Sequence, residues 1–152
     1  MAEKFKAPVE KGKTYTIDIL RLGSNGEGVG RVENFTVFVD GALPGETVTA
    51  RITFVKKQYA TGRLEKVQKP SEHRVKPPCS VYAECGGCQL QHLSYEGQLA
   101  EKRQQVQDAV ERIGKLKDIP VLPTLGADDP WAYRNKMQLP AGGDKKNLHI
   151  GC

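Results

Sequence analysis

The sequence predicts a mainly β protein with some α structure. We expect a five-stranded β-barrel, then a cysteine-rich loop, a helix and the start of an α/β domain. Three observations lead to this expectation: short alternating segments fill residues 14–67, glycine-rich turns separate them, and a helical pattern follows three closely spaced cysteines. The expected boundaries are residues 1–70 for the barrel, 71–93 for the cysteine segment and 94–152 for the helix and the truncated start of a further domain.

The expected barrel strands alternate between apolar and polar residues. They lie at residues 14–21, in two pieces between residues 29 and 39 that break at Glu33-Asn34, at 46–57 and at 59–67. In the segment 46–57, the side chains predicted to point inward are Val48, Ala50, Ile52 and Phe54. Turn signals such as Asn25-Gly26 suit tight turns and barrel corners, and no helix follows them as in a phosphate-binding loop. Five short strands of this kind indicate a barrel like the oligonucleotide-binding fold.

A helix is expected to begin at Ser94, a good N-cap, with Glu96 in its first turn. Its apolar face is predicted to consist of Leu99, Val106, Val110 and Ile113. Gly114 is a suitable end for this helix. Residues 137–139 and 148–150 are expected to form the first strands of the next domain.

The net charge and the distribution of apolar residues limit the classes of protein to which this chain can belong. The net charge is +5 with a pI near 9.0, and residues 1–70 carry most of the surplus. A basic barrel suits a polyanionic partner such as RNA. No stretch approaches the roughly 20 apolar residues that span a bilayer. The first six residues lack the apolar core of a secretory signal, so a cytoplasmic protein without membrane contact is expected.

Three cysteines, Cys79, Cys85 and Cys88, lie within ten positions in a loop that contains Gly86-Gly87. Structural disulfides are rare in the cytosol, so this spacing indicates metal binding by soft thiolates. Two ligand sets agree with the spacing. One is a closed Cys3His zinc site completed by His92, and the other is a four-iron cluster completed by a distant cysteine.

Four segments resemble a known family. GEGVGR at residues 26–31 and VFVDGALPGE at residues 37–46 resemble a TRAM domain, an RNA-binding barrel. Pro78-Cys79, CGGCQ at residues 85–89 and QHLSY at residues 91–95 resemble the iron–sulfur segment of TRAM-bearing RNA uracil-5-methyltransferases. WAYRNK at residues 131–136 resembles the opening of the central domain of that family. The similarity runs along almost the whole chain.

The resemblance implies an S-adenosylmethionine-dependent enzyme that forms 5-methyluridine in large-subunit ribosomal RNA. It also implies that Cys79, Cys85 and Cys88 hold a 4Fe-4S cluster whose fourth ligand lies beyond this chain. Cys152 follows an expected strand at the end of the sequence and is not counted as that ligand. The nucleophilic cysteine, the catalytic base and the S-adenosylmethionine site are expected in a C-terminal domain outside these residues, so no catalytic residue is assigned here.

Within the implied enzyme, this chain is expected to capture ribosomal RNA, with no obligate protein partner. The predicted RNA-binding cations are Lys56, Lys57, Arg51 and Arg63 in the barrel and Arg134 and Lys136 in the last segment. The candidate stacking aromatics are Phe35, Phe38 or Tyr59, and about half of these rings are expected to lie in the core instead. The alternative hypothesis is a non-enzymatic RNA-binding protein with a structural Cys3His zinc site.

Overall fold

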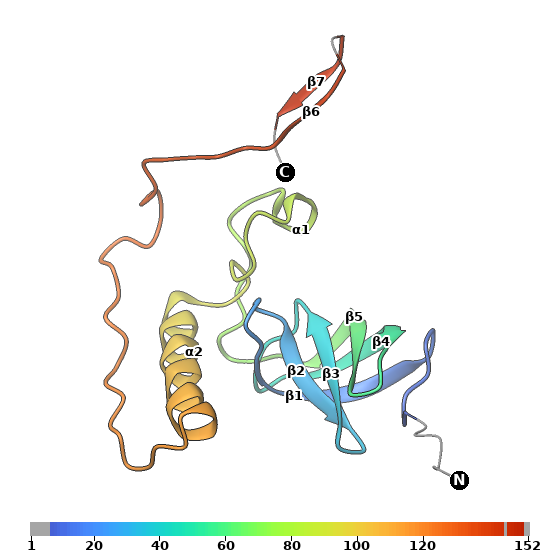
Figure 1. Cartoon of the computed structure of the whole chain (residues 1–152). Coiled ribbons are helices and arrows are strands. Elements are labelled where there is room, and N and C mark those ends of the chain that lie inside the picture. Colours follow the sequence, from blue (N-terminus) through green and yellow to red (C-terminus); the bar gives the residue numbers. More distant parts are fainter. Residues whose placement is uncertain (1–6, 145, 151–152) are drawn as a thin grey trace.

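The barrel predicted from the sequence is present in the computed structural model, which describes residues 7–144 and 146–150. Its strands are β1 (Thr14–Leu22), β2 (Gly28–Val32), β3 (Phe35–Asp40), β4 (Thr47–Val55) and β5 (Tyr59–Lys69). They close into a barrel in the order β1-β2-β3-β5-β4, as Figure 1 shows. The β3–β5 pair is parallel and the other pairs are antiparallel. The mainly β fold class is therefore confirmed.

Alternation along the strands builds the barrel core. Side chains with at most 1% exposure fill it from β1, β3 and β4: Ile17, Val37, Val39, Val48, Ala50 and Ile52. The inward prediction for Phe54 is wrong, because its side chain is 48% exposed. The β4–β5 register shifts between Ile52 and Phe54, so β4 carries an extra residue there. Such a bulge reverses the alternation beyond it and turns Phe54 outward.

Three backbone positions shape the β1–β2–β3 corner. Glu33 and Asn34 have φ values of 47° and 66°, so a tight turn with two left-handed residues joins β2 to β3, where the sequence predicts the break. A Cβ on Gly30 would lie 2.3 Å from Ile17 Cγ2 and 2.6 Å from the Asp18 carbonyl oxygen. Glycine at this position therefore allows β1 and β2 to approach closely.

The helical segments are α1 (Tyr82–Cys85), α2 (Tyr95–Asp108) and a π-helical turn, η1 (Ala109–Ile113). Ser94 Oγ accepts a hydrogen bond from the Gly97 N–H at 3.1 Å, and Gly114 follows the last turn, so both predicted ends are confirmed. The expected apolar face is largely uncovered: Val106 is 52% exposed and Ile113 is 82% exposed.

The last strands are β6 (Ala141–Gly143) and β7 (Leu148–Ile150), which pair antiparallel. The strand expected at 148–150 is confirmed, whereas residues 137–139 form no strand. Asp144 Oδ1 accepts hydrogen bonds from the N–H groups of Lys146 and Asn147 at 2.8 and 2.9 Å. This local turn directs residues 141–143 to pair with β7.

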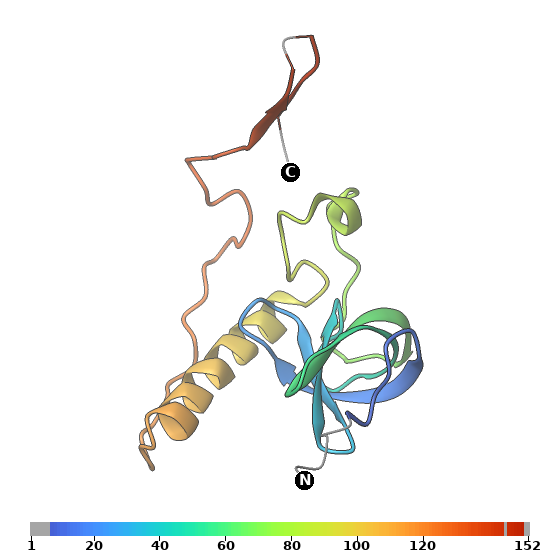
Figure 2. The same cartoon turned by 45° about the vertical axis from the view of Figure 1, so that its right-hand side comes forward.

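Figures 1 and 2 show the barrel on one side and α2 beside it, with the cysteine segment at the junction. The irregular chain after α2 runs back along the helix, and the β6–β7 hairpin stands away from the barrel. In the described part of the chain, no helix is both long enough and apolar enough to cross a bilayer.

Candidate nucleic-acid interface

The hairpin between β4 and β5 carries exposed aromatic and basic side chains. We call Phe54, Lys56, Lys57 and Tyr59 of this hairpin, together with Phe38 of the neighbouring strand β3, the hairpin patch. The rings of Phe38 and Tyr59 meet edge to face with their centroids 5.4 Å apart. Lys56 Nζ lies 5.8 Å from the Phe54 ring centroid and 5.5 Å from that of Tyr59, so the cation rests against both rings. Exposed rings beside cations suit both the bases and the phosphates of a single strand.

The structure revises the predicted set of stacking residues. Phe38 and Tyr59 are partly exposed and belong to the hairpin patch, as expected. Phe35 is the core member of the three candidates, because this residue is only 7% exposed and packs in the barrel core. Phe54 takes its place through the bulge in β4. Strict alternation predicts that Phe54 lies in the core. The two lysines that follow Val55 directly after it are the feature of the sequence that indicates a surface position.

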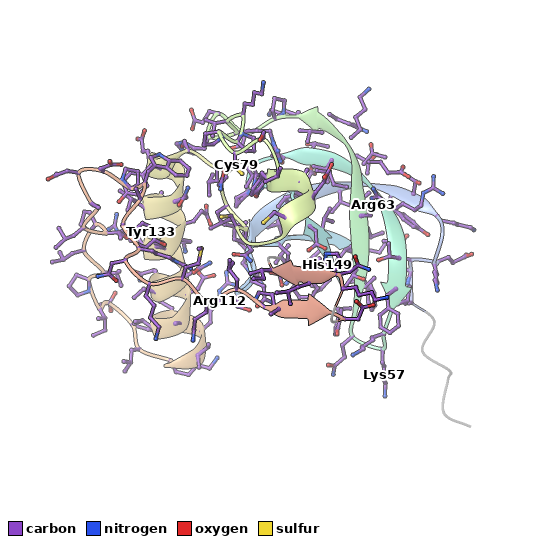
Figure 3. The ribbon with its side chains drawn as sticks, turned by 90° about the horizontal axis from the view of Figure 1, so that it is seen from above. Lys57, Arg63, Cys79, Arg112, Tyr133 and His149 are labelled. Carbon is purple, nitrogen blue, oxygen red and sulfur yellow. The ribbon has the colours of Figure 1, made fainter. Side chains whose placement is uncertain are left out.

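The predicted barrel cations are placed in different environments. Lys56, Lys57 and Arg63 are exposed, and Figure 3 shows Lys57 and Arg63 on the barrel side of the molecule, away from α2. Arg51 is already engaged: its Nε lies 2.5 Å from Glu65 Oε1, and its guanidinium also donates to the Gly12 carbonyl oxygen. The hydrogen bond from Arg51 lowers the pKa of Glu65. Arg51 is therefore the least available of these four cations.

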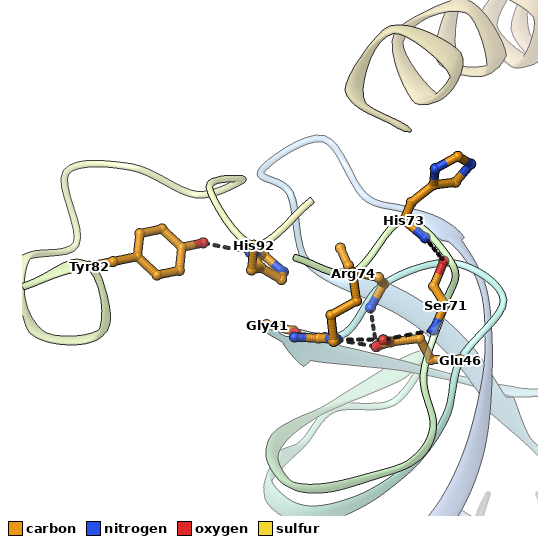
Figure 4. A network of polar contacts seen from close by, with 8 residues as sticks. Gly41, Glu46, Ser71, His73, Arg74, Tyr82 and His92 are labelled. Carbon is orange, nitrogen blue, oxygen red and sulfur yellow. Dashed lines mark hydrogen bonds and ion pairs between the residues drawn. The ribbon is translucent and has the colours of Figure 1, made fainter. Parts of the chain in front are cut away.

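A buried carboxylate joins the barrel to the cysteine segment. The Glu46 side chain has no solvent exposure, and it accepts hydrogen bonds from Arg74 Nε at 2.5 Å and from a terminal Arg74 nitrogen at 2.8 Å. It also accepts from the backbone N–H groups of Leu43 at 2.9 Å and Ser71 at 3.2 Å. Arg74 donates in addition to the Gly41 carbonyl oxygen at 2.6 Å, so one ion pair connects the loop before β4 to the chain after β5 (Figure 4).

The base of the cysteine loop is closed next to this ion pair. Arg74 and Leu93 form an isolated antiparallel bridge. The Val75 N–H donates to the His92 carbonyl oxygen at 3.0 Å, and the Ser94 N–H donates to the His73 carbonyl oxygen at 2.8 Å. A small apolar cluster packs below this bridge and consists of Leu22, Leu43, Leu90 and Leu93. The loop that carries the three cysteines is therefore held at both ends against the barrel.

The three cysteines are free thiols. Cys79 and Cys85 are partly buried and Cys88 is exposed. Gly86, with φ of 70°, ends α1 directly after Cys85 and turns the chain toward Cys88. Over residues 7–144 and 146–150, no three His, Cys, Asp or Glu side chains are gathered into a metal site. Three unpaired thiols in a short loop are suitable ligands for a soft metal ion. Within the described residues, these thiols are not arranged as a coordination shell.

His92, the alternative fourth ligand, is buried beside this loop with 5% exposure. The Tyr82 hydroxyl donates to the Gln89 carbonyl oxygen at 2.7 Å and lies 2.6 Å from His92 Nδ1 (Figure 4). Because the hydroxyl has one proton, we assign the Nδ1 proton to His92, which leaves a lone pair on Nε2. Nε2 is buried and has no hydrogen-bond partner among the described residues. Burial, followed by the charge of Arg74, lowers the pKa of His92.

The barrel matches a family model described as the TRAM domain over residues 8–64. Residues 8–64 form a TRAM domain. This match covers β1 to β4 and the first half of β5, and therefore most of the hairpin-bearing barrel. The TRAM domain predicted from residues 26–31 and 37–46 is confirmed.

Relatives extend the similarity beyond the TRAM domain. The chain is 50% identical over 144 residues to a Clostridium tetani protein named an uncharacterized RNA methyltransferase, which covers 95% of this chain and 31% of that protein. It is 50% identical over 147 residues to a Halalkalibacterium halodurans protein of the same description, covering 95% of this chain and 32% of that protein. The chain thus spans about a third of the length of these relatives. These matches confirm the predicted resemblance to RNA methyltransferases that carry a TRAM domain.

One solved structure is also similar. It is the solution structure of a conserved protein from Methanococcus maripaludis, 34% identical, with 40% of this chain and 87% of that chain covered. The TM-score of this comparison is 0.39.

The remaining predicted cations lie outside the TRAM domain. Arg134 and Lys136 are exposed in the irregular segment before β6. The Arg134 guanidinium lies 5.8 Å from the ring centroid of Tyr133, which Figure 3 shows beside α2. These two cations are therefore separate from the hairpin patch. Cys152 lies outside the described residues.

Proposed function

We propose that this chain is the RNA-capturing part of an S-adenosylmethionine-dependent methyltransferase that forms 5-methyluridine in large-subunit ribosomal RNA in the cytoplasm. The observation that carries the proposal is a TRAM barrel with an exposed aromatic and basic hairpin patch in a chain that is 50% identical to an RNA methyltransferase over 95% of its length. The proposed parts keep the predicted boundaries, namely the barrel in residues 1–70, the cysteine segment in 71–93 and the start of the central domain in 94–152.

The chemistry of this reaction explains why RNA binding and catalysis are assigned to different parts of the enzyme. Methylation at C5 of uracil requires a thiolate that attacks C6, a base that removes the C5 proton, and a target base that has left its stack. We assign the nucleophile, the base and the methyl-donor site to the part of such proteins that this chain does not span. The TRAM domain then supplies binding energy and orientation, because phosphate contacts and base stacking hold the strand in register.

The hairpin patch is expected to bind RNA in a salt-dependent manner. Each lysine that neutralises a phosphate releases a counterion, so affinity falls as salt rises. Replacing both Lys56 and Lys57 by Ala should shallow the slope of log affinity against log salt by roughly 1.4 for a single strand. Fluorescence anisotropy with a labelled single-stranded RNA at several salt concentrations measures this slope.

A matched variant removes the same charge elsewhere. Lys115 and Lys117 are exposed in the loop after η1, and their replacement by Ala should leave the slope close to that of the parent chain. If RNA binding does not depend on salt, or if both double variants change the slope equally, the hairpin patch is not the phosphate-binding surface.

We further propose that Cys79, Cys85 and Cys88 hold a 4Fe-4S cluster with a fourth ligand outside this chain. Three free thiols next to Gly86, in a loop held at both ends, support this assignment. When bound, the cluster would cross-link the loop and so orient the segments on either side of it. A thiolate that is bound to iron is not free to attack uracil, so these cysteines receive no catalytic role.

Metal analysis tests the cluster. We expect the chain purified without oxygen to contain iron and acid-labile sulfide in equal amounts, on the order of four of each per chain. Cys85→Ser should abolish both, because the loop then has two thiolates. Cys88 is a matched second position, and Cys88→Ser should have the same effect. Zinc without iron in the parent chain would contradict the cluster.

One observation favours a second candidate function. The buried, unprotonated Nε2 of His92 is the form of imidazole that binds metal, and it lacks a partner within the described residues. A non-enzymatic RNA-binding protein could therefore hold structural zinc through Cys79, Cys85, Cys88 and His92. About one zinc per chain, lost in His92→Ala, together with salt-dependent RNA binding would support this alternative.

A further inference from the structure

A groove separate from the hairpin patch lies between the TRAM barrel and α2. Its volume is about 870 Å³, and its walls come from the β1–β2 loop, the end of the cysteine loop, α2 and residues 130–134. We call it the α2 groove. Its size is within the roughly 300–1,000 Å³ of small-ligand pockets. No part of the hairpin patch lines it, and Figure 3 shows Tyr133 and Lys57 on opposite sides of the molecule.

The barrel and the cysteine loop meet in a close contact at one wall of this groove. Gly26 has φ of 88°, and a Cβ there would lie 3.2 Å from Gln89 Cβ and 3.2 Å from Leu90 Cδ2. The β1–β2 loop and the cysteine loop therefore form a continuous wall. Because both ends of the cysteine loop are held by the Arg74–Leu93 bridge, this wall has a fixed support.

Two of the lining residues carry exposed aromatic rings. Trp131 is 52% exposed and Tyr133 is 73% exposed. Arg134 stands over the Tyr133 ring, so a flat cation and an aromatic face are presented together. Tyr95 has a structural task instead, because its hydroxyl accepts a hydrogen bond from the Ala127 N–H at 2.7 Å. Trp131 and Tyr133 are thus the rings available for stacking.

Amide side chains among the lining residues supply hydrogen-bonding groups. Gln98 is occupied, since its Nε2 donates to the carbonyl oxygens of Leu90 and Leu93. Asn25, Gln89 and Gln105 are exposed in the groove, and their side-chain amides have no hydrogen-bond partner within residues 7–144 and 146–150. An amide offers both a donor and an acceptor, which matches the edges of nucleobases.

The charges of the groove favour a polyanion. Lys102 and Arg134 contribute two cations, and Glu101 is the carboxylate among the lining residues. Burial raises the pKa of Glu101. The lining also contains the aliphatic residues Leu22, Val75, Leu90 and Leu93, beside the rings, amides and cations.

We propose that the α2 groove binds unpaired nucleotides of the RNA, with their bases stacked on Trp131 and Tyr133 and their edges read by Asn25, Gln89 and Gln105. The proposal rests on the proposed function as an RNA-capturing chain. Single-stranded RNA is recognised in this manner, by aromatic or guanidinium stacking and by hydrogen bonds to exposed base edges. The RNA would then contact the protein at two separated places, the hairpin patch and the α2 groove.

The fluorescence of Trp131 provides a direct test, because it is the only tryptophan of the chain. An unstructured single-stranded RNA of about ten nucleotides should quench this fluorescence as it binds. Tyr133→Leu should weaken binding by about 5-fold or more, as expected for the loss of one stacked base. Leu125→Ala is the matched control, since Leu125 is 95% exposed in the same irregular segment and lies outside the groove.

The outcomes separate this inference from the proposed function. If RNA binds with the expected salt dependence but leaves Trp131 unquenched and is insensitive to Tyr133→Leu, the groove proposal fails and the RNA-capturing function stands. Equal quenching by inorganic polyphosphate or by a fully duplex RNA would also overturn base recognition. If no RNA binding is measurable, the proposed function itself fails.

Discussion

Glu46→Ala is expected to lower the free energy of unfolding by about 3–5 kcal/mol, the cost of leaving one partner of a buried ion pair without its counter-charge. The variant also leaves the N–H groups of Leu43 and Ser71 without their acceptor. The total stability of a domain is only about 5–15 kcal/mol, so the effect is large. Urea denaturation of both chains at neutral pH measures it.

The pH dependence of stability should follow from the same carboxylate. Burial raises the pKa of Glu46, but the hydrogen bonds from Arg74, Leu43 and Ser71 together outweigh it, so the pKa is below the ordinary value of 4.5. A depressed carboxyl pKa contributes stability above the unfolded-state pKa, and this contribution is lost as the pH falls through the folded-state pKa. The stability difference between the parent chain and Glu46→Ala should therefore shrink as the pH falls below 4.5.

Glu65→Ala is the matched control. Glu65 also pairs with an arginine at 2.5 Å, but the Arg51–Glu65 pair lies on the surface, with side-chain exposures of 56% and 33%. Exposed pairs contribute about 0–1 kcal/mol. If Glu65→Ala costs as much as Glu46→Ala, or if the Glu46 effect persists unchanged in acid, burial is not the cause of the expected loss.

Leu43→Ala is expected to cost about 2–5 kcal/mol of stability. Leu43 has no solvent exposure and packs with Leu22 and Leu93, so truncation leaves a cavity between the barrel and the base of the cysteine loop. The loss should also loosen the loop. Hydrogen exchange at the Val75 and Ser94 amides should increase more than exchange in the middle of the barrel strands, because these two amides close the loop base.

Leu20→Ala makes the same chemical change on the surface. Leu20 is in β1 and is 59% exposed, so its truncation should change the unfolding free energy by about 0.5 kcal/mol or less. Similar losses for the two leucine variants would contradict the assignment of Leu43 to a core shared by the barrel and the cysteine segment.

Much of the barrel follows from local sequence. The alternation in residues 14–21 and 46–52 predicts strands with one buried face, and the structure has β1 and β4 there. The break at Glu33-Asn34 becomes a two-residue turn with positive φ values. Ser94 caps α2 through the Gly97 N–H as expected. These features depend on residues within a few positions of each other, so a single sequence is enough to predict them.

The errors share a physical reason. The alternation of apolar and polar residues continues to Phe54 and therefore predicts that this side chain points inward. The bulge that turns it outward depends on how β4 pairs with β5, which alternation within one strand does not encode. Residues 137–139 were assigned to a strand, but the Asp144 turn selects residues 141–143 as the partner of β7. The apolar positions of α2 predict a covered face, yet Val106 and Ile113 remain exposed in the described structure.

Short segments of the chain encode the turns, the helix cap, the three clustered thiols and the resemblance to TRAM-bearing methyltransferases, and these features can therefore be predicted from the residues alone. Folding brings Glu46 to Arg74, 28 positions away, and places Trp131 and Tyr133 in one groove with Gln89. Such contacts form between residues that are far apart in the sequence, so local sequence patterns do not predict them.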